Sequence, residues 1–217
     1  MGRREERRTD AEAGELRHGV PFTPLASSQN LFKGLNTRLH EQYVGLAFMA
    51  THGKKDVQFV TGSNALKLIF NAEVPTLVVQ QRSPVRPYRH ILLPLLSHQA
   101  EMQFPVEMLQ AIVRVFGSKI ILLTPAAANS KEQDELKKAV DRFTGALQEV
   151  ASGIIVKSSD QPEKKWSKSV VSIAEEQGVD LIAVLVGAKH HREEAEKTKR
   201  FYQAVITNEH GVPVLCL

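Results

Sequence analysis

The sequence predicts an α/β fold: a parallel, doubly wound, five-stranded sheet, in tandem with a first unit of the same kind that is incomplete. Three observations lead to this prediction. From residue 89 onward, short apolar runs alternate with helical patterns, as expected for parallel strands joined by right-handed helical crossovers. Val44 to Ala50 is almost continuously apolar, which is typical of a strand covered on both faces. Two landmarks also recur at a nearly constant spacing, as an internal duplication requires.

The first half contains the end of such a unit. Val20 to Ala26 is a short extended run, and leucines at four-residue spacing predict an amphipathic helix over residues 28–42. The apolar strand that ends at Ala50 is followed by a glycine-bearing loop, a helix and a second strand from Pro75 to Val79. These elements form one strand, helix, strand unit.

The segment after this unit is predicted to be a linker. Gln80 to Pro87 carries two prolines and two arginines, a composition typical of connections. We therefore expect a partial domain over residues 1–80, a linker over 81–88 and a complete domain over 89–217.

The second half supplies every element of a doubly wound domain. Trp166 opens one of its helices and is expected to cover the sheet. The strands are expected at His90 to Leu95, Lys119 to Leu123, Gly153 to Val156, Leu181 to Val186 and Val212 to Leu215, and the helices at 100–116, 131–150, 164–177 and 194–209.

The internal repeat shows what the first unit lacks. The strands that end at Ala50 and Gly187 are 137 residues apart, and Pro75 and Pro213, which open matching last strands, are 138 residues apart. The same spacing places the counterpart of the strand that starts near His90 before the first residue. The first unit is therefore expected to lack its first strand, first helix and second strand.

The glycine-bearing loop of the first unit has the residues of an anion site. Gly53 and Gly62 allow backbone N–H groups to approach phosphate oxygens closely, and Ser63 adds a hydroxyl donor where a helix begins. The partial positive charge of a helix N-terminus favours an anion at this place. The same spacing also suits a tight turn that merely requires glycine, and spacing alone does not separate the two interpretations.

With these residues in view, the chain resembles the universal stress protein family over nearly its whole length. The family has a strand ending in glycine, two residues, a second glycine, nine residues, and Gly-Ser or Gly-Thr before a helix and a Pro-containing last strand. Here the pattern is Ala50, Thr51 and His52, Gly53, eight residues, then Gly62-Ser63, and RHILLPLLS resembles the family's opening strand.

The resemblance implies an adenine-nucleotide α-hydrolase-like, Rossmann-like fold and a cofactor that is ATP or another adenine nucleotide. The candidate cofactor-binding residues that it implies are His52, Gly53, Gly62, Ser63 and Asn64.

This sequence departs from the family pattern in both halves. Ala50 replaces the first glycine, and the loop is one residue shorter. The family's first-strand Asp, near the adenine, falls in the absent segment of the first unit and is replaced by Leu96 in the second. Gly187 is followed by Ala188 and Lys189, and no Gly-Ser precedes the last strand. The first half thus keeps only the phosphate end of the site, and the second half keeps neither end.

Other candidates for chemistry are weaker. His190 and His191 with Glu193 and Glu194 contain metal-ligand types, but adjacent histidines need a third well-placed ligand, and we expect no metal. Cys216 lies in an apolar strand and is expected in the core. The sequence has no nucleophile elbow, no Walker loop and no paired carboxylates at strand ends, so we expect no enzyme activity.

Composition and charge narrow the partners and the compartment. The net charge is +4, with basic residues interleaved among acidic ones, which argues against nucleic acid. A single cysteine excludes an internal disulfide and fits a reducing compartment. No apolar run approaches about 20 residues, and the charged N-terminus lacks the core of a signal peptide. We expect a cytoplasmic protein that contacts no membrane.

These observations predict a non-enzymatic stress-response module that resembles the universal stress proteins. A homodimer is expected, because the apolar last strands, TLVV and VLCL, would lie at sheet edges where unpaired backbone groups invite pairing. Two alternatives stay open: a dimerisation scaffold that binds no ligand, and an ATP-using ligase or hydrolase on the same fold.

Overall fold

The computed structural model describes residues 44–51, 66, 69–70, 74–100, 104–162, 165–186 and 200–217. The predicted helix over 28–42 and the extended run before it lie outside these residues. No helix in the described ranges is both long enough and apolar enough to cross a membrane.

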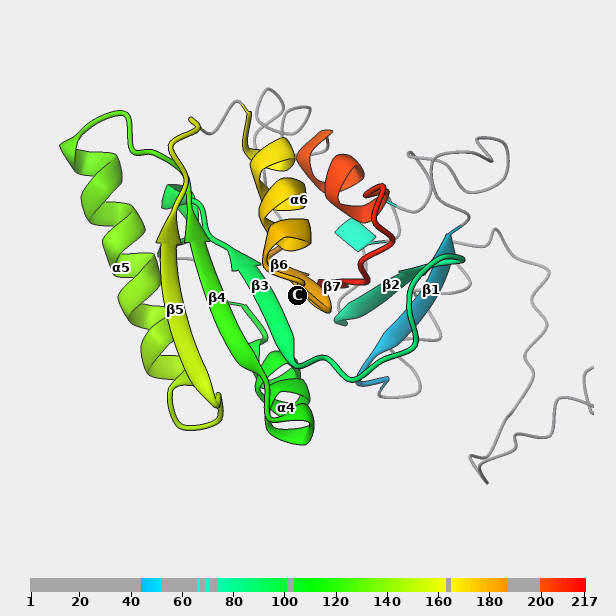
Figure 1. Cartoon of the computed structure of the whole chain (residues 1–217). Coiled ribbons are helices and arrows are strands. Elements are labelled where there is room, and N and C mark those ends of the chain that lie inside the picture. Colours follow the sequence, from blue (N-terminus) through cyan, green and yellow to red (C-terminus); the bar gives the residue numbers. More distant parts are fainter. Residues whose placement is uncertain are drawn as a thin grey trace, which may run out of the picture.

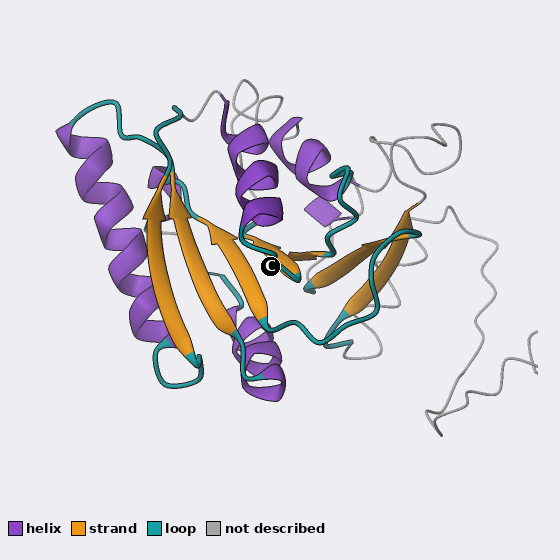
Figure 2. Ribbon diagram, in the orientation of Figure 1, coloured by secondary structure: helices purple, strands orange, loops and turns teal. Residues whose placement is uncertain are grey.

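The described chain forms a seven-stranded sheet with helices on both faces (Figures 1 and 2). The strand order is β1-β2-β7-β6-β3-β4-β5. The strands are β1 (Ala47–Thr51), β2 (Thr76–Gln80), β3 (His90–Pro94), β4 (Lys119–Thr124), β5 (Gly153–Ser158), β6 (Leu181–Val184) and β7 (Val214–Cys216). The helices are the 3-10 turn η1 (Ser97–Gln99), α4 (Val106–Phe116), α5 (Ser130–Leu147), α6 (Trp166–Glu176) and a helical stretch over 200–206.

Strands β3 to β7 form the parallel, doubly wound sheet that the sequence predicts. All neighbours among them pair in parallel, in the order β7-β6-β3-β4-β5. Successive side chains of β3 enter opposite cores, with Leu92 on the face of α6 and Ile91 on the face of α4 and α5. Figure 1 shows α6 and the stretch 200–206 side by side over the first of these faces. The predicted fold class is confirmed.

Some boundaries differ from the predicted ones. The first helix of this part was expected from residue 100, but η1 and Pro105 precede α4, which begins at Val106. Because proline fixes φ and has no N–H to donate, it suits the residue just before a helix.

The last strand ends at Cys216, which is 3% exposed, and Trp166 is 2% exposed. The expected core positions of Cys216 and Trp166 are confirmed.

The junction between β2 and β7 corrects the expected position of the last strands. They pair antiparallel with each other inside one chain, with Leu77 opposite Leu215 and Val78 opposite Val214. Both strands are therefore interior, and among the strands that the structure describes, β1 and β5 are the edges. Each strand supplies the backbone partners that the other would lack at an edge, and the pairing buries Val78 and Leu215. The edge position assumed for a homodimer was wrong.

Polar side chains fasten this junction. The Gln80 amide donates to the carbonyls of Ile206 at 3.1 Å and Asn208 at 3.0 Å, at the end of the helical stretch 200–206 and just after it. The Ser83 hydroxyl donates to the Gly211 carbonyl at 2.7 Å. Residues 81–89 then lead from β2 to β3. The predicted domain boundary over 81–88 stays a prediction.

Candidate functional site

In an open parallel sheet, ligands bind beyond the carboxyl ends of the strands where the strand order reverses. Between β3 and β6 the order reverses, because the chain proceeds from β3 to β4 on one side and returns through β6 to β7 on the other. The residues just beyond these two strand ends, Leu95, Leu96 and Leu185, therefore mark the expected crevice of the second half.

Two described side chains, Gln99 and Tyr202, hydrogen-bond to the backbone at these strand ends. Gln99 is 3% exposed, and its carbonyl oxygen accepts from the Leu96 backbone N–H at 2.9 Å. Its amide donates to the Leu185 carbonyl at 3.3 Å, and the Tyr202 hydroxyl donates to the same carbonyl. Gln99 thus bridges the ends of β3 and β6 at the reversal point. A ligand there would have to replace these hydrogen bonds.

Burial keeps the Tyr202 hydroxyl protonated. Tyr202 is 1% exposed, and burial raises the pKa of its hydroxyl well above the usual range. The hydroxyl therefore stays a donor to Leu185. Leu96, at the position of the family's Asp, is 7% exposed and packs in the core beside α6. Among the described residues of the second half, those at the reversal point are internally paired or apolar.

Sequence reasoning did not identify Gln99 or Tyr202. A local signal existed for Gln99, because it is the third residue of η1 and forms a capping interaction with Leu96. Tyr202 gave no such signal, because its partner lies 17 residues away in the chain.

The carboxyl end of β1 is where the candidate cofactor-binding loop begins. His52, Gly53, Gly62, Ser63 and Asn64 lie outside the described residues, so their positions stay predictions. The metal candidates His190, His191, Glu193 and Glu194 also lie outside them.

The described residues on either side of this loop are well packed. Thr51 ends β1 and is 7% exposed. Leu66 and Ile69, which are helical, are 2% and 4% exposed and belong to the same core as Val78. In the described ranges, two buried side-chain polar atoms lack a hydrogen-bond partner, Thr51 Oγ1 and Trp166 Nε1.

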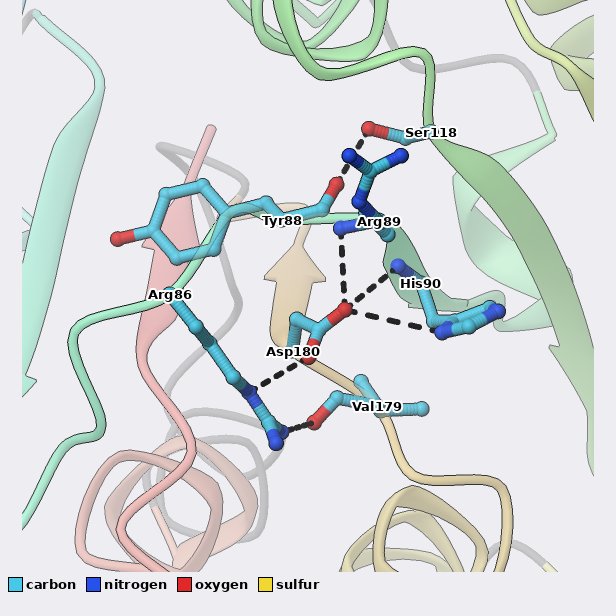
Figure 3. A network of polar contacts seen from close by, with 7 residues as sticks. All are labelled: Arg86, Tyr88, Arg89, His90, Ser118, Val179 and Asp180. Carbon is cyan, nitrogen blue, oxygen red and sulfur yellow. Dashed lines mark hydrogen bonds and ion pairs between the residues drawn. The ribbon is translucent and has the colours of Figure 1, made fainter.

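A cluster of charged and polar groups lies at the amino ends of β3 and β6 (Figure 3). The Asp180 carboxylate accepts from the backbone N–H groups of Arg89 at 3.0 Å and His90 at 2.9 Å. Arg86 Nε lies 2.6 Å from its other oxygen and the guanidinium also donates to the Val179 carbonyl at 3.1 Å. Asp180 thus connects the segment 81–89 to the starts of β3 and β6.

A groove of about 400 Å³ separates α6 from the turn after the stretch 200–206. His210 Nε2 lies 3.2 Å from a Glu175 oxygen in this groove. Among the described residues, no group of three or more His, Cys, Asp or Glu side chains is placed to hold a metal ion. The lining residues are Ser167, Lys168, Val171, Ser172, Glu175, Ala204, Asn208, Glu209 and His210.

Three solved structures have a similar fold at low sequence identity. A functionally unknown protein from Pseudomonas aeruginosa PAO1 has a TM-score of 0.66 and 14% identity, with 100% of this chain and 79% of that chain covered. A protein from Pseudomonas aeruginosa UCBPP-PA14, provisionally assigned as a universal stress protein, has a TM-score of 0.64 and 15% identity, with the same coverage. A universal stress protein from Archaeoglobus fulgidus DSM 4304 has a TM-score of 0.58 and 14% identity, covering 85% of this chain and 64% of that chain.

Sequence comparison adds no closer relative. No protein-family profile matches the chain, and no curated protein matches it. By its structure the chain belongs to the Rossmann-like α/β class. Within that class, its fold is that of the universal stress proteins.

Proposed function

We propose that the chain is a non-enzymatic stress-response module of the universal stress protein type that binds ATP or another adenine nucleotide in its first half only. The observation that supports this asymmetry is the bridge made by Gln99 between Leu96 and Leu185. Because that bridge and Tyr202 occupy the reversal point of the second half, we place the ligand at the carboxyl end of β1, where the candidate loop begins. A cytoplasmic location is part of the proposal.

The first half keeps the phosphate end of the family's pattern. The loop with Gly53, Gly62 and Ser63 follows β1 directly, and backbone N–H groups near glycines are well suited to phosphate oxygens. We therefore expect the triphosphate to contribute more affinity than the base.

Calorimetric titration with ATP tests the proposal. We expect one ATP per chain, and we expect Gly62→Val to abolish binding. Gly145→Val is the matched control, because an added Cβ at Gly145 in α5 meets nothing within 4 Å. A stoichiometry of two, or unchanged binding in Gly62→Val, would contradict the proposal. Steady ATP turnover that is lost in Gly62→Val would instead support an ATP-using enzyme.

The closed crevice also favours a second candidate, a scaffold that binds no ligand. If the folded protein gives no heat with ATP, ADP or AMP, this alternative is supported, because both halves would then lack a ligand. Its function would reside in its surfaces.

We also propose that two copies associate through β1. It is an edge strand, its residues Ala47–Thr51 carry no charge, and Phe48 is 71% exposed. The opposite edge, β5, carries Lys157, whose amine bonds the Gln177 side chain at 2.7 Å. Charged side chains on an edge strand oppose pairing, so β1 is the better edge for a second copy.

A further inference from the structure

The segment 83–89, which leads from β2 to β3, contains neither helix nor strand. A tight hydrogen bond stands at each end of its central part. The Ser83 N–H donates to the Gln80 carbonyl at 2.8 Å before it, and the Arg89 N–H donates to the Pro87 carbonyl at 3.0 Å after it. Between these two bonds, a short piece of chain has no ladder or helical hydrogen bonds to set its conformation.

The prolines set that conformation instead. Proline holds φ near about −65°, and the residue before a proline is confined to extended backbone angles. Pro84 and Pro87 are preceded by Ser83 and Arg86, so these four residues are all restricted to angles that suit a polyproline II helix. That helix has about three residues per turn.

The inward contacts of the segment recur with the same period. The Ser83 hydroxyl donates to the Gly211 carbonyl at 2.7 Å. Three residues later, Arg86 Nε lies 2.6 Å from an Asp180 carboxylate oxygen, and the guanidinium donates to the Val179 carbonyl at 3.1 Å. One ridge of the segment is thus anchored to the protein at two points.

The outward side of the segment is apolar, with positive charge at both ends. Pro84, Val85 and Pro87 are exposed, and Val85 is fully exposed. The flanking residues Arg82 and Arg89 are exposed as well, and Figure 3 shows the Arg89 guanidinium turned away from the ion pair below it. A groove that fits this side has apolar walls and negative charge at its rim.

We propose that residues 84–87 dock into the aromatic-lined groove of a partner protein of the SH3 type. Such grooves bind Pro-x-x-Pro segments in the polyproline II conformation. A ligand that is held in this conformation before binding loses less conformational entropy when it binds. The anchors at Ser83 and Arg86 supply that restraint here. The proposal goes beyond the proposed function and does not depend on nucleotide binding.

The test is calorimetric titration of the full chain with an isolated SH3 domain whose groove is lined by aromatic side chains and bordered by acidic ones. We expect Pro84→Ala and Pro87→Ala each to weaken binding about tenfold, and the double variant to abolish it. Pro162→Ala is the matched control, because Pro162 is also exposed but lies in the loop after β5. It should bind like the wild type, and circular dichroism should show all four variants folded.

A synthetic peptide of residues 82–89 provides the second comparison. It should bind the same domain more weakly than the chain does, because it loses on binding the freedom that the anchors remove in the folded protein. A chain that gives no binding overturns the proposal, and so does a peptide that binds more tightly than the chain. Binding that survives the double substitution, or that Pro162→Ala weakens to the same extent, places the contact elsewhere and overturns it as well.

Discussion

Asp180 is a carboxylate that the fold keeps almost entirely from water. Its side chain is 8% exposed, and it accepts hydrogen bonds from two backbone N–H groups and pairs with Arg86. A buried carboxylate is tolerated only with such partners, because removing it from water is costly. The partners belong to the linker and to the start of β3, so one side chain holds the connection between the two halves in place.

We expect Asp180→Asn to lower the free energy of unfolding by about 1–3 kcal/mol, because the Arg86 pair is lost and an amide group faces donors. Asp160→Asn is the control, since Asp160 is exposed and, in the described part of the chain, its side chain accepts from the neighbouring Gln161 amide. Urea denaturation measures both variants. Equal stability of the two would show that the buried carboxylate does not fasten the linker.

Cys216 predicts a dependence of stability on pH. Burial raises the pKa of its thiol from 9.0 to about 12. The folded state therefore holds the thiol proton more tightly than the unfolded state. This stabilisation is complete below pH 9 and is lost as the pH rises from 9 to 12, by about 1.4 kcal/mol per pH unit.

The measurement is the free energy of unfolding in urea at pH 8 and pH 10, for the wild type and for Cys216→Ala, which has no thiol to titrate. Between these pH values the wild type should lose about 1.4 kcal/mol more than the variant. Parallel losses in the two proteins would show that the thiol reaches water in the folded state.

At the scale of elements, the hydrophobic pattern predicted the positions of the five strands of the second half, with small differences at their ends. Continuous apolar runs such as Lys119 to Leu123 permit no other assignment when helices lie between them. The antiparallel pairing of β2 with β7 was not predictable in this way, because any apolar strand can supply the same backbone ladder. What selects this partner includes Gln80 and Ser83, whose acceptors lie more than 120 residues away.

The same limit applies to the site. The glycine loop is a local pattern and was visible in the sequence, whereas the closure by Gln99 and Tyr202 depends on the distant carbonyl of Leu185. The unpartnered hydroxyl of Thr51 was equally invisible, because a partner's absence is known only after packing. Local patterns thus locate a loop on this fold, and tertiary contacts decide whether a crevice stays open.

The turn before β7 offers a test of the junction. Gly211 has φ +68°, and a Cβ there would lie 3.1 Å from the Arg82 carbonyl oxygen. Gly117, which ends α4 at φ +60°, has nothing within 4 Å of the same position. Gly117→Ala should cost about 1 kcal/mol from its backbone conformation alone, and Gly211→Ala should cost more because Arg82 must also shift. Thermal unfolding compares the stability of the two variants. Equal losses of stability would mean that Arg82 moves aside without a cost in free energy.

At the scale of the whole molecule, the described strands form one continuous sheet whose two edges, β1 and β5, differ. The pairing of β2 with β7 joins the halves internally, so neither strand is available to another copy. Strand β5 is covered on one face by α5 and carries the charged Lys157. Strand β1 has no charged side chain, and its Phe48 side chain is exposed. A copy that joins β1 to β1 by a two-fold axis would extend the sheet and satisfy the free edge in both chains.

We expect the wild type to have about twice the chain mass of 24.1 kDa in light scattering at micromolar concentration. Phe48→Lys should give a monomer, because a charged side chain on an edge strand opposes its pairing with another strand. Val156→Lys, at a 52% exposed position on β5, should stay a dimer. Both side chains are exposed, so neither change should alter the thermal unfolding of the single chain. A wild-type monomer would contradict self-association. A dimer that Val156→Lys dissociates and Phe48→Lys does not would show that the copies associate through β5 and not through β1.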